Sequence, residues 1–179
     1  MRELGLRMLV SHGADAETAR RHGIEVVAAR LPDDEIPDAA AAYGLDGTHR
    51  PVLTLVGELL AVKPVPAGAG VSYGYTHRTR TPTSLGLVGL GYADGVPRLG
   101  SNRAALSIDG VRYPLVGRIA MDQLVIDLGS DTHAPGAEVV VFGDPARGEP
   151  SAQEWAAWGE RTPLALTAGL GHRIHREAR

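Results

Sequence analysis

Short apolar or alternating runs recur along the chain from residue 51 onward, and glycine or proline stands between most of them. Runs of this length and spacing are typical of β-strands in an all-β barrel or sandwich. The strongest local signal is Asp109-Gly110, because this dipeptide between two β-prone runs favours a tight hairpin turn. The pattern predicts strands at residues 52–62, 84–90, 104–108, 111–116, 124–128 and 138–142.

The first 45 residues follow a different pattern. Two β-prone runs, at 6–10 and 24–29, alternate with possible helices at 16–22 and 33–43. This β-α-β-α order is too short for a complete α/β domain. We therefore expect a short α/β segment at residues 1–45 and a mainly β domain at 46–179, a distorted β-barrel or sandwich of about eight strands.

Two segments near the carboxy terminus carry helix signals of unequal strength. Ser151 is followed three residues later by Glu154, which is a capping box and predicts a short helix through Trp158. The apolar stretch at 164–170 is compatible with either a strand or a helix, so its pattern alone leaves the choice open.

Composition limits the function classes. The formal net charge is −3, so no basic field favours nucleic acid or an anionic membrane surface. The chain has no cysteine, which excludes disulfides, thiolate ligands and cysteine nucleophiles, and its histidines lack ligand-like company. No apolar run approaches the roughly 20 residues that span a bilayer, and we expect a cytoplasmic protein without a membrane segment.

Three segments place reactive side chains beside glycine: VSYG at 71–74, GYADG at 91–95 and GRIAMD at 117–122. Loops on a rigid β scaffold are where functional groups concentrate. A tyrosine, with an ordinary pKa near 10, can move protons only if a cation lies nearby, and an arginine could also attract a carboxylate substrate. Each residue also has a plainer interpretation as a surface aromatic, a turn aspartate or a solvated arginine, so spacing alone predicts no enzyme.

Taken together, VSYG, GYADGVPR and VGRIAMDQ resemble, in order and spacing, the carboxy-terminal domain of alanine racemases, which use pyridoxal phosphate (PLP). The resemblance runs from about residue 43 to 143 and continues more weakly to Arg176. It implies that Tyr73 is the catalytic tyrosine that exchanges the α-proton on one face of a PLP-bound amino acid. It also implies that Tyr92 and Met121 approach the substrate from a partner subunit.

The same resemblance assigns two further residues. Arg98 and Arg118 match arginines that line the corridor by which the substrate enters, so they are expected to bind substrate. Asp94 and Asp122 are expected to support the site structurally. The GYADG and GRIAMDQ segments favour the racemases over the related PLP-dependent decarboxylases, whose carboxy-terminal β domain is similar in outline.

The residues that hold PLP in the family are missing here. Racemisation needs a lysine that binds the cofactor and serves as a second base, and the family carries it in an amino-terminal (β/α)₈ barrel. Lys63 is the only lysine and falls inside the β-domain match. Pro37 stands where the family has an arginine for the pyridine nitrogen, and Leu164 where it has a tyrosine for the phosphate.

We therefore expect PLP by resemblance only, with none bound to this chain alone. The expected partner is a second copy or a separately encoded PLP-barrel protein, to which the chain supplies Tyr73 in trans, and the expected substrate is a small amino acid. The alternative is a non-catalytic module that binds a partner or a carboxylate. Residues 1–45 are interpreted as a barrel remnant, with an unrelated appendage or a mis-started reading frame as the alternatives.

Overall fold

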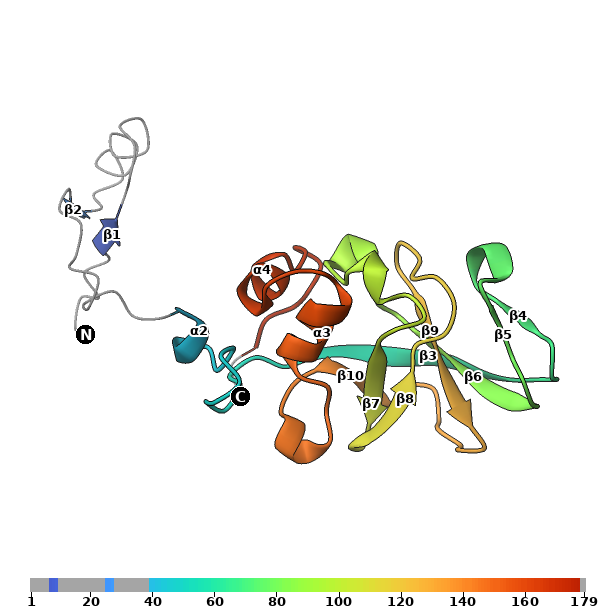
Figure 1. Ribbon diagram of the computed structural model, residues 1–179. Coiled ribbons are helices and arrows are strands. Elements are labelled where there is room, and N and C mark those ends of the chain that lie inside the picture. Colours follow the sequence, from blue (N-terminus) through green and yellow to red (C-terminus); the bar gives the residue numbers. More distant parts are fainter. Residues whose placement is uncertain (1–6, 10–24, 28–38, 178–179) are drawn as a thin grey trace. The chain divides into compact units, whose positions relative to one another are not determined.

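The computed structural model describes residues 7–9, 25–27 and 39–177, which fall into two compact units, Met1–Asp38 and Ala39–Arg179 (Figure 1). In the first unit, β1 (Arg7–Leu9) pairs in parallel with β2 (Glu25–Val27). The helix expected at 16–22 and the first part of the one at 33–43 lie outside the described residues. Leu45 lies in the core of the second unit, and a domain boundary after residue 45 stays a prediction.

The second unit is built on one antiparallel sheet of six strands, in the order β8-β7-β10-β3-β6-β9. A bridge between Leu115 and Ile126 joins the two outer strands, so the sheet nearly closes into a barrel. Its strands are β3 (Leu55–Val65), β6 (Thr83–Val88), β7 (Ala105–Ile108), β8 (Val111–Pro114), β9 (Leu124–Gly129) and β10 (Glu138–Phe142). The prediction of a mainly β, barrel-like fold is confirmed.

Residue chemistry explains two local features of this sheet. In β9, Leu124, Ile126 and Leu128 are buried while their neighbours are not, which is the period of two expected for a strand with one face on the core. The turn between β7 and β8 has positive φ at Asp109 (51°) and Gly110 (79°), as a tight hairpin of this type requires. The predicted hairpin is therefore confirmed.

Short elements decorate the sheet between its strands. Between β3 and β6, the strands β4 (Gly70–Val71) and β5 (His77–Arg78) form a small hairpin whose tip is the 3₁₀ turn η1 (Tyr73–Tyr75). Between β6 and β7 lie two more 3₁₀ turns, η2 (Tyr92–Asp94) and η3 (Arg98–Gly100), and η4 (Pro145–Arg147) follows β10.

Two helices, α3 (Ala152–Trp158) and α4 (Pro163–Ala168), pack together at one side of the sheet, and α2 (Ala39–Ala42) begins the unit (Figure 1). The predicted capping box is present, since Ser151 Oγ accepts a hydrogen bond from the Glu154 amide and the Glu154 carboxylate accepts one from the Ser151 amide. The segment left open by the sequence is the helix α4, which Thr162 caps. None of the helices among the described residues has the length and apolar character needed to cross a membrane.

The core lies between the sheet and α3. Trp155 of α3 has no exposed surface, and it joins side chains from the sheet such as Leu59, Val88, Leu106 and Ile126 in one cluster. Burying each of these large apolar side chains stabilises the fold by roughly 1.5–3 kcal/mol. Because α3 contributes Trp155 to this cluster, the stability of its first turn affects the whole second unit.

We predict that Ser151→Ala lowers the free energy of unfolding by about 1 kcal/mol, because the Glu154 amide at the start of α3 loses its acceptor. Urea denaturation followed by tryptophan fluorescence measures the change. Ser130→Ala is the control, since Ser130 is an exposed serine outside the helices. Equal stability of the two variants would contradict the prediction.

Tyr113 should make stability depend on alkaline pH. Burial, followed by a hydrogen bond and the charge of Asp131, raises its pKa to about 12, and its hydroxyl donates to Asp131 Oδ2 at 2.7 Å. A folded pKa above the unfolded value of about 10 gives stability that is complete below pH ~10 and lost as the pH rises to about 12. An absorbance titration should therefore show one late tyrosine, and Tyr113→Phe should remove that late step. A titration without a late step in the wild type would contradict this assignment.

Candidate functional site

Tyr73 lies on a backbone turn with unusual geometry. Positive φ angles occur at Ser72 (55°), Gly74 (73°) and Tyr75 (46°), so three of four successive residues adopt the left-handed region. For residues other than glycine this conformation costs about 1–2 kcal/mol each, and such strain clusters at functional sites. The Tyr73 side chain is 72% exposed. The turn therefore presents a phenol at the surface at an energetic cost.

The guanidinium of Arg118 lies directly over this turn. A Cβ atom built on Gly74 would be in ordinary van der Waals contact with the guanidinium, 3.5 Å from Arg118 Nη1. The preceding residue, Gly117, also packs closely, because a Cβ there would be 2.7 Å from Ser72 Oγ. The structure thus places Arg118 against Gly74, the residue that follows Tyr73 in the turn.

Asn102 ties these two segments together, and sequence reasoning missed it. Its Oδ1 accepts a hydrogen bond from the Gly117 amide at 2.6 Å, and its Nδ2 donates to Thr76 Oγ1 at 3.1 Å. One side chain therefore links the turn before Arg118 to the residue that follows η1. The signal available in the sequence was the asparagine itself, because asparagine tolerates a positive φ, here 59°, better than most residues. The sequence does not reveal its hydrogen-bond partners.

Tyr92 and Met121 lie on two backbone segments that pair with each other. The amides of Tyr92 and Ala93 donate to the carbonyls of Ala120 and Met121, each at 3.0 Å. A Cβ atom on Gly91 would lie 2.3 Å from the Met121 carbonyl oxygen, so only glycine permits this approach. Tyr92 is 39% exposed and Met121 54% exposed, so both side chains are accessible beside this pairing.

Asp94 and Asp122 meet at one arginine that sequence reasoning also missed. Both oxygens of buried Asp94 accept hydrogen bonds from Arg173, at 3.0 Å each, and Arg173 Nη2 donates to Asp122 Oδ1 at 2.7 Å. The Asp122 bond, followed by those of Asp94, raises the pKa of Arg173 above its ordinary value. Asp94 also accepts from the Gly91 amide at 2.9 Å, so this cluster fixes both η2 and the segment after Met121.

Arg98 lies against Tyr92, with its guanidinium carbon 5.2 Å from the ring centre, a cation–π contact.

A hollow of about 340 Å³ lies next to the Tyr73 turn and is lined by Tyr73, Leu87, Ala120 and Val125, among others. Ala120 accepts the amide of Tyr92, so this hollow connects the Tyr73 turn with the segment that pairs with η2. No group of three His, Asp or Glu residues able to hold a metal ion occurs in the described part of the chain.

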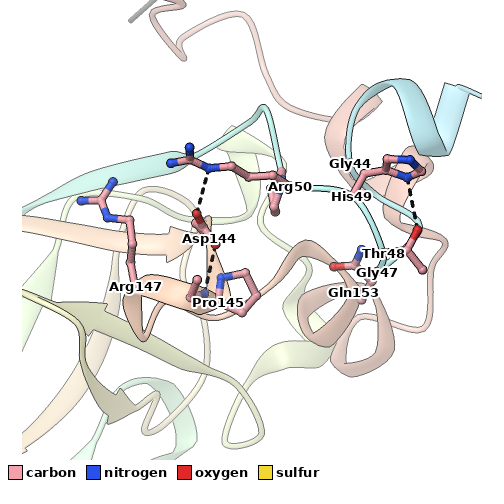
Figure 2. A pocket seen from close by; sticks show the side chains of 11 residues that line it. Gly44, Gly47, Thr48, His49, Arg50, Asp144, Pro145, Arg147 and Gln153 are labelled. Carbon is pink, nitrogen blue, oxygen red and sulfur yellow. Dashed lines mark hydrogen bonds and ion pairs between the residues drawn. The ribbon is translucent and has the colours of Figure 1, made fainter.

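A second hollow, of about 620 Å³, is lined by residues of the 44–51 and 144–147 segments (Figure 2). Each of its charged side chains has a partner in the chain. Arg50 Nε donates to Asp144 Oδ2 at 3.1 Å, Arg147 pairs with Glu149 at 3.3 Å, and His49 Nδ1 lies 2.7 Å from Asp46 Oδ2. The hollow contains none of the site residues expected from the sequence.

We predict that Arg173→Gln loosens the segment carrying Met121 against η2, because the guanidinium that joins Asp94 to Asp122 is lost while the backbone hydrogen bonds remain. The expected result is a shifted and broadened Met121 methyl signal in an NMR spectrum of methyl-labelled methionine, together with lower stability. Arg176→Gln is the matched control, since Arg176 donates only to backbone carbonyls. A Met121 signal unchanged by Arg173→Gln would show that the cluster does not hold this segment.

Comparison with known proteins gives one family. The family model "Alanine racemase, C-terminal domain" matches residues 52–178. The alanine racemase of Streptomyces coelicolor is 47% identical over 145 residues, covering 81% of this chain and 36% of that protein. That of Mycolicibacterium vanbaalenii is 52% identical over 135 residues, covering 70% of this chain and 35% of that protein.

Solved structures agree with the sequence comparison. The alanine racemase structure from Streptomyces coelicolor has a TM-score of 0.69 and 49% identity, covering 71% of this chain and 33% of that one. The Bartonella henselae enzyme, solved with covalently bound pyridoxal phosphate, has a TM-score of 0.70 and 29% identity, covering 76% and 39%. The chain spans about a third of the length of the curated relatives it matches, and it belongs to the family of alanine racemase carboxy-terminal domains.

Proposed function

We propose that this domain supplies Tyr73 in trans as an acid–base residue for the interconversion of L- and D-alanine. The observation that carries the proposal is the strained turn, in which positive φ angles at Ser72, Gly74 and Tyr75 accompany an exposed phenol at Tyr73. Such backbone strain is seldom retained where it has no function.

The chemistry assigned to Tyr73 is a proton transfer at its phenol oxygen. That oxygen takes the α-proton from one face of an amino-acid substrate, or returns it to that face. Arg118 brings a positive charge to the same turn, where its guanidinium lies over Gly74. Racemisation also needs a proton donor and acceptor on the opposite face, so Tyr73 alone is insufficient.

The residues of this chain do not fit the cofactor of the family. Lys63 is exposed and lies within β3, where it is paired with Leu85 of β6, and it lines none of the hollows described above. Leu164 lies exposed on α4 and brings no hydroxyl for a phosphate. On this proposal a cofactor-binding amine and the second base come from outside the described residues, by resemblance from a barrel that holds PLP.

A docking face for such a partner is available around the site. Tyr73, Tyr92 and Met121 are large side chains with 39% to 72% of their surface exposed. Large apolar side chains gathered at a surface commonly mark a binding face. The face contains the side chains that the resemblance assigns to the substrate, so a partner seated there would bring its substrate to Tyr73. The partner is a second copy or a separate barrel protein.

The test is reconstitution with a barrel-only fragment of the Streptomyces coelicolor relative. We expect the mixture, but neither part alone, to form D-alanine from L-alanine in an assay coupled to D-amino-acid oxidase. Tyr73→Phe should lower this activity by about 10²–10⁴-fold, the usual effect of removing a proton-transfer group. Tyr75→Phe is the matched control, since Tyr75 is an exposed tyrosine of the same turn. Full activity in the Tyr73→Phe mixture would refute the proposal.

A further inference from the structure

The hydroxyl of Tyr113 contacts two side chains of the loop at residues 130–137, which joins β9 to β10. It donates to Asp131 Oδ2 at 2.7 Å and lies 3.0 Å from His133 Nε2. The phenol and imidazole rings meet edge to face, with their centres 5.5 Å apart. Three polar atoms thus converge, and none of them belongs to a residue assigned to the site around Tyr73.

The fold holds both sides of this cluster. Tyr113 is the buried residue of β8, so its ring is fixed by the core. The loop begins with a turn, because the Asp131 amide donates to the Leu128 carbonyl at 3.1 Å. Asp131 is exposed and His133 is half-buried, so the cluster can be reached from solvent. The three side chains therefore stand on an ordered scaffold that an ion from solution can approach.

The charge around this cluster is negative. Asp131 contacts the phenol, and Asp109 in the turn between β7 and β8 is the other carboxylate whose charge acts on it. Burial, followed by the Asp131 hydrogen bond and these two charges, raises the pKa of Tyr113 to about 12. Within residues 39–177, neither Asp109 nor Asp131 forms an ion pair. A cation bound here would compensate charge that this part of the protein leaves uncompensated.

The spacing of the three atoms suits ligands of one metal ion. Nitrogen and oxygen ligands bind an ion such as Zn²⁺ at about 2.0–2.2 Å, so two ligands at right angles stand roughly 2.8–3.1 Å apart. The Tyr113 oxygen stands 2.7 Å and 3.0 Å from its two neighbours. Asp131 and His133 lie too far apart for an ion pair, as ligands on opposite sides of an ion do. A right-angled set of nitrogen and oxygen ligands is the arrangement that Cu²⁺ prefers.

We propose that Tyr113, Asp131 and His133 form a binding site for a divalent transition-metal ion, with Cu²⁺ as the ion best suited to it. The set differs from the groups of His, Asp or Glu considered above because a tyrosine completes it. Binding releases one proton, since the Tyr113 hydroxyl loses its hydrogen and becomes a phenolate ligand. The imidazole proton moves from Nε2 to Nδ1, which frees Nε2 for the ion. Neither a partner nor PLP takes part, so this site stands apart from the role proposed for Tyr73.

The full chain, freed of metal with EDTA and then dialysed, can be titrated with copper sulfate while its visible absorbance is recorded. We expect a charge-transfer band from phenolate to Cu²⁺ that saturates, together with a higher melting temperature. Zn²⁺ should compete for the site more weakly than Cu²⁺ binds, as the order of metal affinities requires, and Mg²⁺ should not compete. A titration without a phenolate band, or displacement of Cu²⁺ by Mg²⁺, would overturn the proposal.

Variants then test the three ligands. Tyr113→Phe should abolish the band. His133→Gln and Asp131→Asn should each raise the Kd by at least 10–100-fold, which is the cost of losing merely a partner of a metal ligand. These two variants change no residue of the core, so they test the site even if Tyr113→Phe unfolds the chain. His175→Gln is the matched control, because His175 is an exposed histidine outside the cluster. A band retained in Tyr113→Phe, an unchanged Kd in His133→Gln, or equal weakening in His175→Gln would show that these side chains do not form the site.

Discussion

The pairing of β6 with β9 is the constraint from which the site follows. These strands are antiparallel, and Val88 at the end of β6 stands opposite Leu124 at the start of β9. The chain that leaves β6 and the chain that enters β9 must therefore run side by side. Those two segments contain Tyr92 and Met121, and their backbone hydrogen bonds continue the pairing of the strands beyond the sheet. Near closure of the barrel through Leu115 and Ile126 fixes β9 from its other side as well.

Tyr73 reaches the same region by a different path. Its hairpin leaves the sheet where Val65 of β3 stands opposite Thr83 of β6, which is the far end of β6 from Val88. The hollow that Tyr73 shares with Leu87 and Val125 indicates that the hairpin returns along β6 and β9 toward the η2 segment. Figure 1 shows this hairpin with η1 at its tip, and the positive φ angles around Tyr73 belong to that tip. The hydrogen bonds of Asn102 then hold the returned hairpin against the Arg118 segment.

Local sequence signals predicted the elements whose determinants are local. The Asp109-Gly110 turn and the Ser151 capping box depend on residues within three positions of each other, and both form as predicted. The strand at Glu138–Phe142 likewise matches its predicted range. The strand predicted at 52–62 is β3, which is observed at Leu55–Val65. It extends to Val65 because Lys63 and Pro64 still pair with β6, although lysine is polar and proline tends to break strands. The α4 helix could have been chosen from Thr162-Pro163, a cap followed by proline at the first helical position.

Long-range contacts explain what the sequence did not reveal. Arg173 meets Asp94 across 79 positions and Asn102 meets Thr76 across 26, and no period or short motif encodes either contact. The expected site residues came from a resemblance, and their functional roles stay predictions. What the structure adds is their support: a strained turn, a glycine that only a close backbone approach explains, and an arginine shared by two aspartates.

The arginines of the described residues fall into two groups, those that pair with a carboxylate of the chain and those that do not. Arg112 and Arg173 each form ion pairs with carboxylates of the chain, and these pairs hold separate segments together. Arg98 and Arg161 meet none among the described residues, and both line one hollow next to Tyr92. The role proposed for Tyr73 needs a second base from outside the described residues, whereas the ion pairs of Arg112 and Arg173 lie within this unit and can be tested without any partner.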